Sequence, residues 1–239
     1  MKIKICGLRR PEDVAYANEV MPDYVGFILT EGFRRSITKE TARELKSKLD
    51  PKIKTVGVFV NEKAEYVAEY LEEGIIDLAQ LHGQESEEDV VYLKAVTGKP
   101  VIKVVRLESN RATVKSSPNS NEEEKQCDEA FNQNAEEVYK RYAIEAWLDS
   151  AADYLLFDSG TGTGKTFDWS VLTEVLADYG GTLPKEFFLA GGINAENIDE
   201  AYEQVRPFAV DLSSSVETEG VKDLEKMKLA VSAARKYDE

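Results

Sequence analysis

Eight short apolar segments, each followed by a longer amphipathic segment, constrain the fold of this chain most strongly. The stretches between them have helical spacing, and two open on clear start signals, Pro11-Glu12-Asp13 and Thr38. Strands that alternate with helices are expected to pair in parallel, because parallel strands need a crossover connection. The apolar segments are rich in Val, Ile and Phe and cover residues 3–6, 24–29, 55–60, 77–82, 101–107, 153–158, 186–191 and 208–213.

The number of repeats favours a closed barrel over an open sheet. Eight units in 239 residues match an α/β fold of the (β/α)₈ TIM-barrel type, which has about 250 residues. A doubly wound sheet is the alternative, but Cys6-Gly7-Leu8-Arg9 after the first strand does not follow its glycine-rich pattern. We therefore predict a single barrel domain over residues 1–239. A polar segment at 108–134 is predicted to be an exposed loop inserted after strand five, ahead of a helix at about 135–150.

Charge and cysteine content narrow the function classes. A net charge of −15 leaves little with which to build the basic face that nucleic-acid binding requires. No run approaches the roughly 18 apolar residues of a membrane span, and the first residues do not resemble a signal peptide. Cys6 and Cys127 fit neither a disulfide framework nor a metal site. We expect a cytoplasmic protein without nucleic-acid or membrane partners.

The glycine-rich stretch at 160–166, GTGTGKT, resembles a nucleotide-binding phosphate loop. That motif requires a glycine five residues before Gly164, where this chain has Ser159. Asp168 is predicted to cap a helix that begins at Trp169, which is too late for a phosphate loop. The alternative is that Gly162 and Gly164 close over a different phosphate-bearing ligand.

In a TIM barrel the active site lies at the carboxyl ends of the strands. Cys6 ends strand one and Asp158 ends strand six, so they are the candidate catalytic pair. Cys6 is predicted to be a thiolate base with a lowered pKa, although a buried structural cysteine is the alternative. Asp158 is either an acid or a loop cap, and His82 is either an acid–base group or a structural residue. The loops after strands seven and eight predict a phosphate site, formed by Gly191, Gly192, Ser213, Ser214 and Ser215.

These motifs, in this order, resemble the phosphoribosylanthranilate isomerase family over nearly the whole chain. The resemblance implies an Amadori rearrangement of N-(5'-phosphoribosyl)anthranilate to the 1-amino-1-deoxyribulose phosphate, without a metal or cofactor. It makes Asp158 the acid and Cys6 the base. It also implies that Arg35, or its neighbour Arg34, binds the anthranilate carboxylate and that Asp211 contacts substrate hydroxyls. The matching motifs are KICGL (4–8), FRRSIT (33–38), GVFVNE (57–62), QLHG (80–83), GTGKTFDW (162–169), LAGGINAENI (189–198) and VDLSSSVE (210–217).

One departure and three alternatives stay open. Ser215 stands where the family usually has glycine, and it would weaken phosphate binding if that position needed a left-handed backbone. Lys103 on strand five keeps an indoleglycerol-phosphate synthase possible, whereas a metal-dependent epimerase is disfavoured by the single histidine. A catalytically silent phosphosugar-binding barrel is the third alternative. The assembly is predicted to be a monomer or a homodimer.

Overall fold

The computed structural model describes residues 1–107, 122–158 and 169–238, with the backbone alone over 122–134. Parallel strands close into a barrel in the order β1 to β8, with β1 paired to β8. Each of the eight predicted apolar segments overlaps one of these strands, and the strand bounds differ from the predicted ones by at most two residues, so the predicted TIM barrel is confirmed. The strands are β1 (Lys2–Cys6), β2 (Tyr24–Ile28), β3 (Lys54–Phe59), β4 (Leu78–Leu81), β5 (Val101–Arg106), β6 (Tyr154–Asp158), β7 (Phe187–Leu189) and β8 (Ala209–Leu212).

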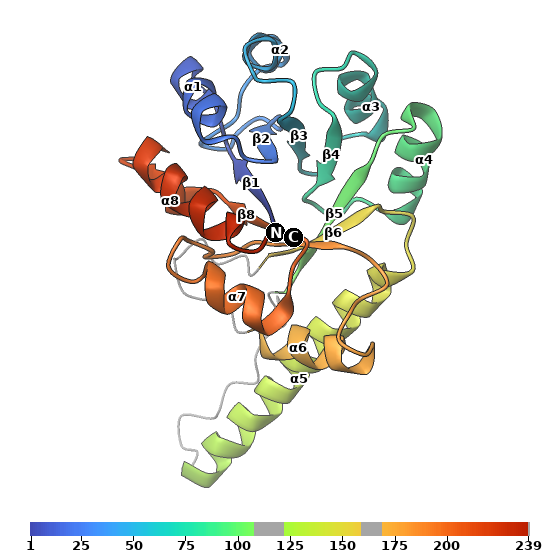
Figure 1. The fold of residues 1–239 in the computed structure, drawn as a ribbon. Helices are drawn as coiled ribbons and strands as arrows, with labels where there is room; N and C mark the ends of the chain where they lie inside the picture. The colour runs from blue at the N-terminus through green and yellow to red at the C-terminus, as the bar shows by residue number, and fades with distance from the viewer. Residues whose placement is uncertain (108–121, 159–168, 239) are drawn as a thin grey trace.

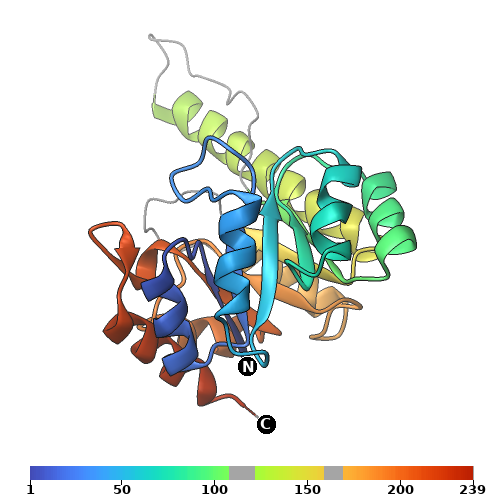
Figure 2. The same cartoon turned by 90° about the horizontal axis from the view of Figure 1, so that it is seen from above.

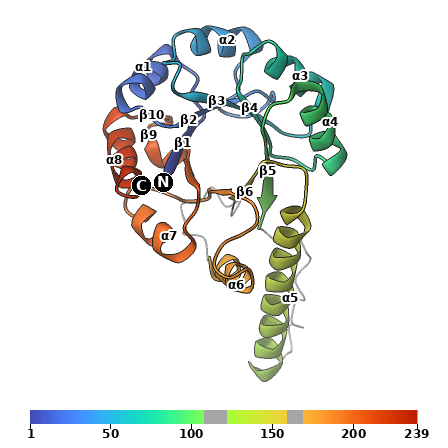
Figure 3. The same ribbon diagram turned by 45° about the vertical axis from the view of Figure 1, so that its right-hand side comes forward.

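Helices surround the strands as an outer ring, and α5 extends away from it (Figures 1 and 3). Seen from above, the long α5 projects beyond the body of the barrel (Figure 2), and its main contacts are with α6 and β5. After β8 the chain forms a short 3₁₀ turn, η1 (Ser214–Val216), and a hairpin of β9 (Glu217–Thr218) and β10 (Val221–Lys222). The helices are α1 (Pro11–Val20), α2 (Lys39–Ser47), α3 (Ala64–Glu72), α4 (Glu87–Thr97), α5 (Glu122–Leu148), α6 (Ser170–Asp178), α7 (Ile198–Val205) and α8 (Leu224–Arg235).

Local signals place the helix starts closely. Thr38 caps α2 by accepting a hydrogen bond from the Thr41 amide, and α1 opens on Pro11. Helix α6 begins at Ser170 with Trp169 as its cap residue, one residue later than predicted. The proposed cap Asp168 lies outside the described residues.

The polar insertion differs from its prediction in one respect. Residues 122–134 are not a loop but the first half of α5, which runs for 27 residues. The stretch contains no glycine or proline, and its four Glu and two Gln are good helix formers, although it has few apolar residues. Residues 108–121 lie outside the described part of the chain.

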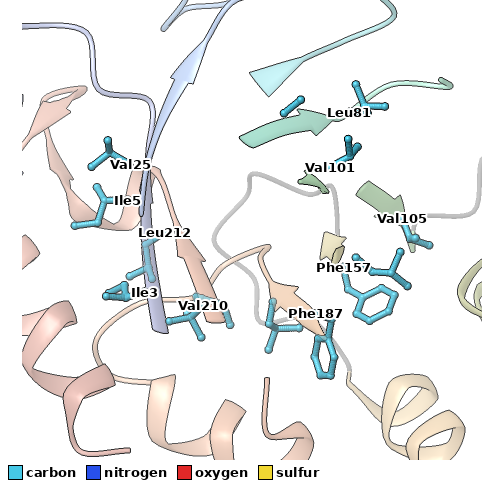
Figure 4. Close-up of a cluster of buried hydrophobic side chains, with 14 of the residues drawn as sticks. Ile3, Ile5, Val25, Leu81, Val101, Val105, Phe157, Phe187, Val210 and Leu212 are labelled. Atoms are coloured by element: carbon cyan, nitrogen blue, oxygen red, sulfur yellow. The ribbon is translucent and has the colours of Figure 1, made fainter. Parts of the chain in front are cut away.

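Two apolar layers hold the barrel. Side chains on the outer strand faces pack against the helices, and Figure 4 shows several of them, including Ile3, Ile5, Val25 and Phe157. Inside, a second cluster is joined by aromatic side chains near the amino ends of the strands, where Tyr154 stacks on Phe208 at 5.3 Å between ring centroids. This aromatic layer fills the amino-terminal half of the barrel interior, and the cavity lined by Cys6 and Asp158 lies toward the carboxyl ends of the strands. No described helix combines the length and apolarity that crossing a membrane would require.

Candidate active site

A cavity of about 290 Å³ opens at the carboxyl ends of the strands. Nine of the eleven predicted site residues line it, and Gly162 and Gly164 lie outside the described residues. The two remaining polar lining residues are Gln80 and His82. The nine are Cys6, Arg35, Asp158, Gly191, Gly192, Asp211, Ser213, Ser214 and Ser215.

Three larger hollows lie elsewhere on the described part of the chain. They measure about 750 Å³ beside α2 and α3, about 630 Å³ between β5 and α5, and about 470 Å³ beside Met1 and Tyr237. None of them is lined by Cys6 or Asp158. The smaller cavity is therefore the candidate active site, because it gathers the reactive side chains.

A buried lysine lies beneath Cys6 in the barrel. Lys4 is fully buried, its Nζ lies 2.7 Å from Oδ2 of Asp211, and its charge interacts electrostatically with Cys6. Burial lowers the pKa of Lys4, but Asp211 and Cys6 raise it by more, so the ammonium stays charged. Asp211 Oδ1 has no partner among the described residues, which leaves an acceptor in the cavity wall.

The Cys6 thiol is in a less activating environment than predicted. Burial raises its pKa above the ordinary value, although Lys4 and Lys222 act in the opposite direction. The expected lowered pKa is therefore wrong for the unliganded site, because desolvation outweighs the two nearby cations. Gly26 on β2 makes room for this side chain, since a Cβ there would lie 2.6 Å from the Cys6 Sγ.

Asp158 is held by the only histidine of the chain. His82 Nε2 lies 3.3 Å from Asp158 Oδ2, and His82 Nδ1 lies 3.1 Å from Nε2 of the buried Gln80. A Gln80 amide that donates to Nδ1 leaves the His82 proton on Nε2, where it faces the carboxylate. His82 thus orients Asp158.

The loops after β7 and β8 form one wall of the cavity. Gly191 and Gly192 have φ values of 81° and 80°, which favour glycine, and Asn194 and Asn197 both donate to the Gly192 carbonyl. Ser215 is not among the residues with positive φ, so the strain considered for this departure does not arise. Its buried Oγ has no partner among the described residues and is available to an anion.

Arg35 lines the cavity, whereas Arg34 does not. Arg35 donates from Nε and Nη2 to the two carboxylate oxygens of Glu217, at 2.6 and 2.9 Å. The Arg34 side chain is 56% exposed and donates to the same carboxylate at 2.8 Å. Of the two arginines, only Arg35 can meet a ligand that also contacts Cys6.

Lys103, the residue that kept the synthase alternative open, points away from the barrel interior. Its Nζ lies 2.8 Å from Glu85 Oε2 and 5.3 Å from the centre of the Trp147 ring on α5. It borders the hollow between β5 and α5 and not the cavity that contains Cys6. It therefore cannot serve as an acid in the barrel mouth.

Comparison with known proteins agrees with this arrangement. The family model described as N-(5'phosphoribosyl)anthranilate (PRA) isomerase matches residues 3–124 and 124–233. The chain belongs to this family. The PRA isomerase of Endomicrobium trichonymphae is 39% identical over 231 residues, which cover 95% of this chain and 94% of that protein.

Solved structures of PRA isomerases have the same barrel. The Thermus thermophilus enzyme aligns with a TM-score of 0.74 at 30% identity, with all of both chains covered. A PRA isomerase in complex with reduced 1-(o-carboxyphenylamino)-1-deoxyribulose 5-phosphate aligns with a TM-score of 0.69 at 30% identity over 99% of each chain. The family resemblance seen in the motifs is thus confirmed.

Sequence reasoning named most of the wall of this PRA isomerase cavity but missed two buried groups. Lys4 belongs to the KICGL motif, and a lysine inside an apolar strand is the signal that could have identified it. Glu217 lies in the VDLSSSVE motif, but nothing in the sequence alone pairs it with an arginine 182 residues away. The roles of the nine lining residues remain proposals.

Proposed function

We propose that this chain isomerises N-(5'-phosphoribosyl)anthranilate, with Asp158 as the general acid and Cys6 as the general base. The observation that carries the proposal is the single cavity in which a thiol, a carboxyl, an arginine and two loops suited to phosphate line the same wall. Family membership supports the reaction class. The ligand of the solved PRA isomerase complex carries both a carboxyphenyl group and a 5-phosphate, which matches this set of side chains.

The chemistry needs one proton donor and one proton acceptor. Asp158 gives a proton to the furanose ring oxygen, the C1–O bond breaks, and the anthranilate nitrogen forms the Schiff base. Cys6 then removes the C2 proton, and the electron pair moves toward nitrogen to give an enolamine. Tautomerisation of the enolamine gives the ketone, so the formula of the sugar is unchanged.

The neighbouring side chains serve these steps. His82 keeps the Asp158 carboxyl turned toward the cavity. Lys4 stabilises the thiolate form of Cys6, which the base must adopt before it accepts the C2 proton. Asp211 receives a substrate hydroxyl on its available oxygen, and Gly192 and the serines 213–215 hold the phosphate. Arg35 binds the anthranilate carboxylate.

The test follows the fluorescence of freshly generated phosphoribosylanthranilate after the purified protein is added in the presence of a chelator. Fluorescence loss well above the spontaneous rate is expected. Cys6→Ser and Asp158→Asn are each expected to reduce the rate about 10²- to 10⁴-fold. A folded wild-type protein that binds the phosphosugar without accelerating the loss would instead make it a silent binding protein. Sedimentation would decide between the predicted monomer and homodimer.

A further inference from the structure

Outside the proposed chemistry, one carboxylate gathers three cations. Glu217 is only 5% exposed and accepts from Arg35 Nε at 2.6 Å, Arg35 Nη2 at 2.9 Å, Arg34 Nη2 at 2.8 Å and Lys222 Nζ at 2.9 Å. Charge-assisted bonds of this kind are strong and directional, and the paired bonds from Arg35 fix the plane of its guanidinium. Glu217 therefore fixes the orientation of the Arg35 side chain.

The β9–β10 hairpin presents Glu217 and Lys222 together. The two residues lie directly opposite each other across the antiparallel pair. The turn between them, Glu219-Gly220, has φ values of 51° and 79°, as a tight hairpin requires. Arg9 donates to the Gly220 carbonyl at 3.1 Å and to the Arg34 carbonyl at 3.3 Å, which fastens the hairpin to the loop after β2. The carboxylate is therefore held rigidly against that loop.

Arg35 is confined from the other side as well. Its chain packs across Gly7, where a Cβ would lie 2.5 Å from the Arg35 Cδ. Gly7 follows Cys6 directly and has a φ of 85°. Nε and half of Nη2 are taken by Glu217, and Nη1 donates to none of the described residues. Arg35, whose Nη1 edge is thus free of these bonds, lines the same cavity as Cys6.

We propose that Glu217 is a positioning residue that holds the free edge of Arg35 toward the cavity to receive the carboxylate of the aromatic half of the substrate. The inference rests on the proposed function, because it names the group that sets specificity for that carboxylate. Among the described residues, three cations share this one carboxylate, which leaves two positive charges unmatched. A second carboxylate can therefore bind beside Glu217 without a net excess of negative charge.

The first measurement compares Glu217→Gln with the wild type in steady-state turnover and in ligand binding. Gln has the same size but loses the charge and one acceptor, so Arg35 can no longer donate to two carboxylate oxygens at this position. KM is expected to rise about 10-fold while kcat stays within about twofold, because the contact is equal in the ground and transition states. Two reduced product analogues are used as probes, one with the ring carboxylate and one with an unsubstituted phenyl ring.

The carboxylate-bearing analogue is expected to bind Glu217→Gln about 10-fold more weakly, and the phenyl analogue within about twofold of the wild type. In an Arg35→Ala background, adding Glu217→Gln should not weaken binding of the carboxylate-bearing analogue any further, since Glu217 acts through Arg35. Asp23→Asn is the matched control, because Asp23 is a half-buried carboxylate paired with Lys2 and Arg235 at the opposite end of the barrel. Asp23→Asn should change the affinity for neither analogue.

Equal weakening of both analogues, or tighter binding of the carboxylate analogue, would overturn the inference; the second result would mean that Glu217 competes for Arg35. If Glu217→Gln does not fold, Glu217→Asp is the second variant, because it retains the charge on a shorter side chain. It should also weaken binding of the carboxylate analogue more than binding of the phenyl analogue, but by a smaller factor. Failure of the isomerase proposal would appear separately, as a wild type without turnover.

Discussion

The Nζ of Lys4 lies 2.7 Å from Oδ2 of Asp211 and interacts electrostatically with Cys6, so one buried ammonium acts on both the proposed base and an acidic neighbour. Because Lys4 is fully buried, it acts on the thiol without screening by water. The pKa of Cys6 nevertheless lies above its ordinary value, since burial dominates. The reactivity of the thiol therefore depends on Lys4.

The pH dependence of Cys6 alkylation tests this dependence. In a Cys127→Ser background, iodoacetamide should react slowly at pH 7, and the rate should still be rising above pH 9.0, the ordinary thiol value. Lys4→Met removes a cation that favours the thiolate, so the profile should move to still higher pH and the rate at pH 8 should fall about 10-fold. An unchanged or faster reaction in Lys4→Met would show that Lys4 does not tune the thiol.

Ser215 offers a test of the phosphate loop. Its backbone is unstrained and its buried Oγ has no partner among the described residues, so we expect the hydroxyl to donate to phosphate. Ser215→Gly should raise the inhibition constant of inorganic phosphate and the KM by about 3- to 10-fold with little change in kcat. Stronger phosphate inhibition of the variant would mean that the serine obstructs the site.

Lys103 should matter for stability and not for catalysis. Lys103→Met leaves the Glu85 carboxylate without its cation and is expected to cost about 3 kcal/mol of unfolding free energy in urea titrations. At temperatures where the variant is folded, kcat and KM should stay within about twofold of the wild type. Lys99→Met, at an exposed position, is the control and should change neither quantity. A loss of kcat comparable to that of Asp158→Asn would instead show that Lys103 takes part in catalysis.

Glu217 should contribute to stability in a pH-dependent way. Although burial opposes it, hydrogen bonds from Arg35 and Lys222 lower the pKa of Glu217 from 4.5 to about 2. A depressed carboxylate pKa stabilises the fold above the unfolded value near 4.5, and the contribution is lost as the pH falls through about 2. A shift of this size corresponds to on the order of 3 kcal/mol.

Urea unfolding of the wild type and Glu217→Gln at several pH values measures this contribution. The difference between the two proteins should be constant between pH 5 and 7 and should shrink as the pH is lowered from 4.5 toward 2. A difference that does not depend on pH would show that the charge of Glu217 is not the stabilising feature.

The barrel could be predicted because every strand carries its own local signal. Periodicity fails where polarity and helicity coincide, as in residues 122–134, where a polar composition conceals good helix formers. It also fails to assign the face of β5. Strands of a parallel barrel are buried on both sides, so no alternation of polar and apolar residues showed that Lys103 faces outward.

The sequence predicted nine of the residues that line the cavity, but not the ion pairs and charge interactions among them. Cys6, Asp158 and the glycines follow strand ends, and a rule about barrels brings them together. The pairing of Arg35 with Glu217 spans 182 residues, and the pKa of Cys6 depends on the balance of burial against Lys4 and Lys222. Both are properties of distances in the folded chain, which a single sequence does not contain.

The aromatic layer around Tyr154 and Phe208 also restricts the route by which ligands enter and leave the barrel. Because these rings fill the amino-terminal half of the barrel, substrate and product share one doorway at the carboxyl ends of the strands. If Arg35 and the serines 213–215 bind the ligand as proposed, its aromatic ring and its phosphate enter and leave past the same side chains that recognise them. Higher affinity at this rim is therefore expected to slow product release, so turnover should be greatest at an intermediate affinity.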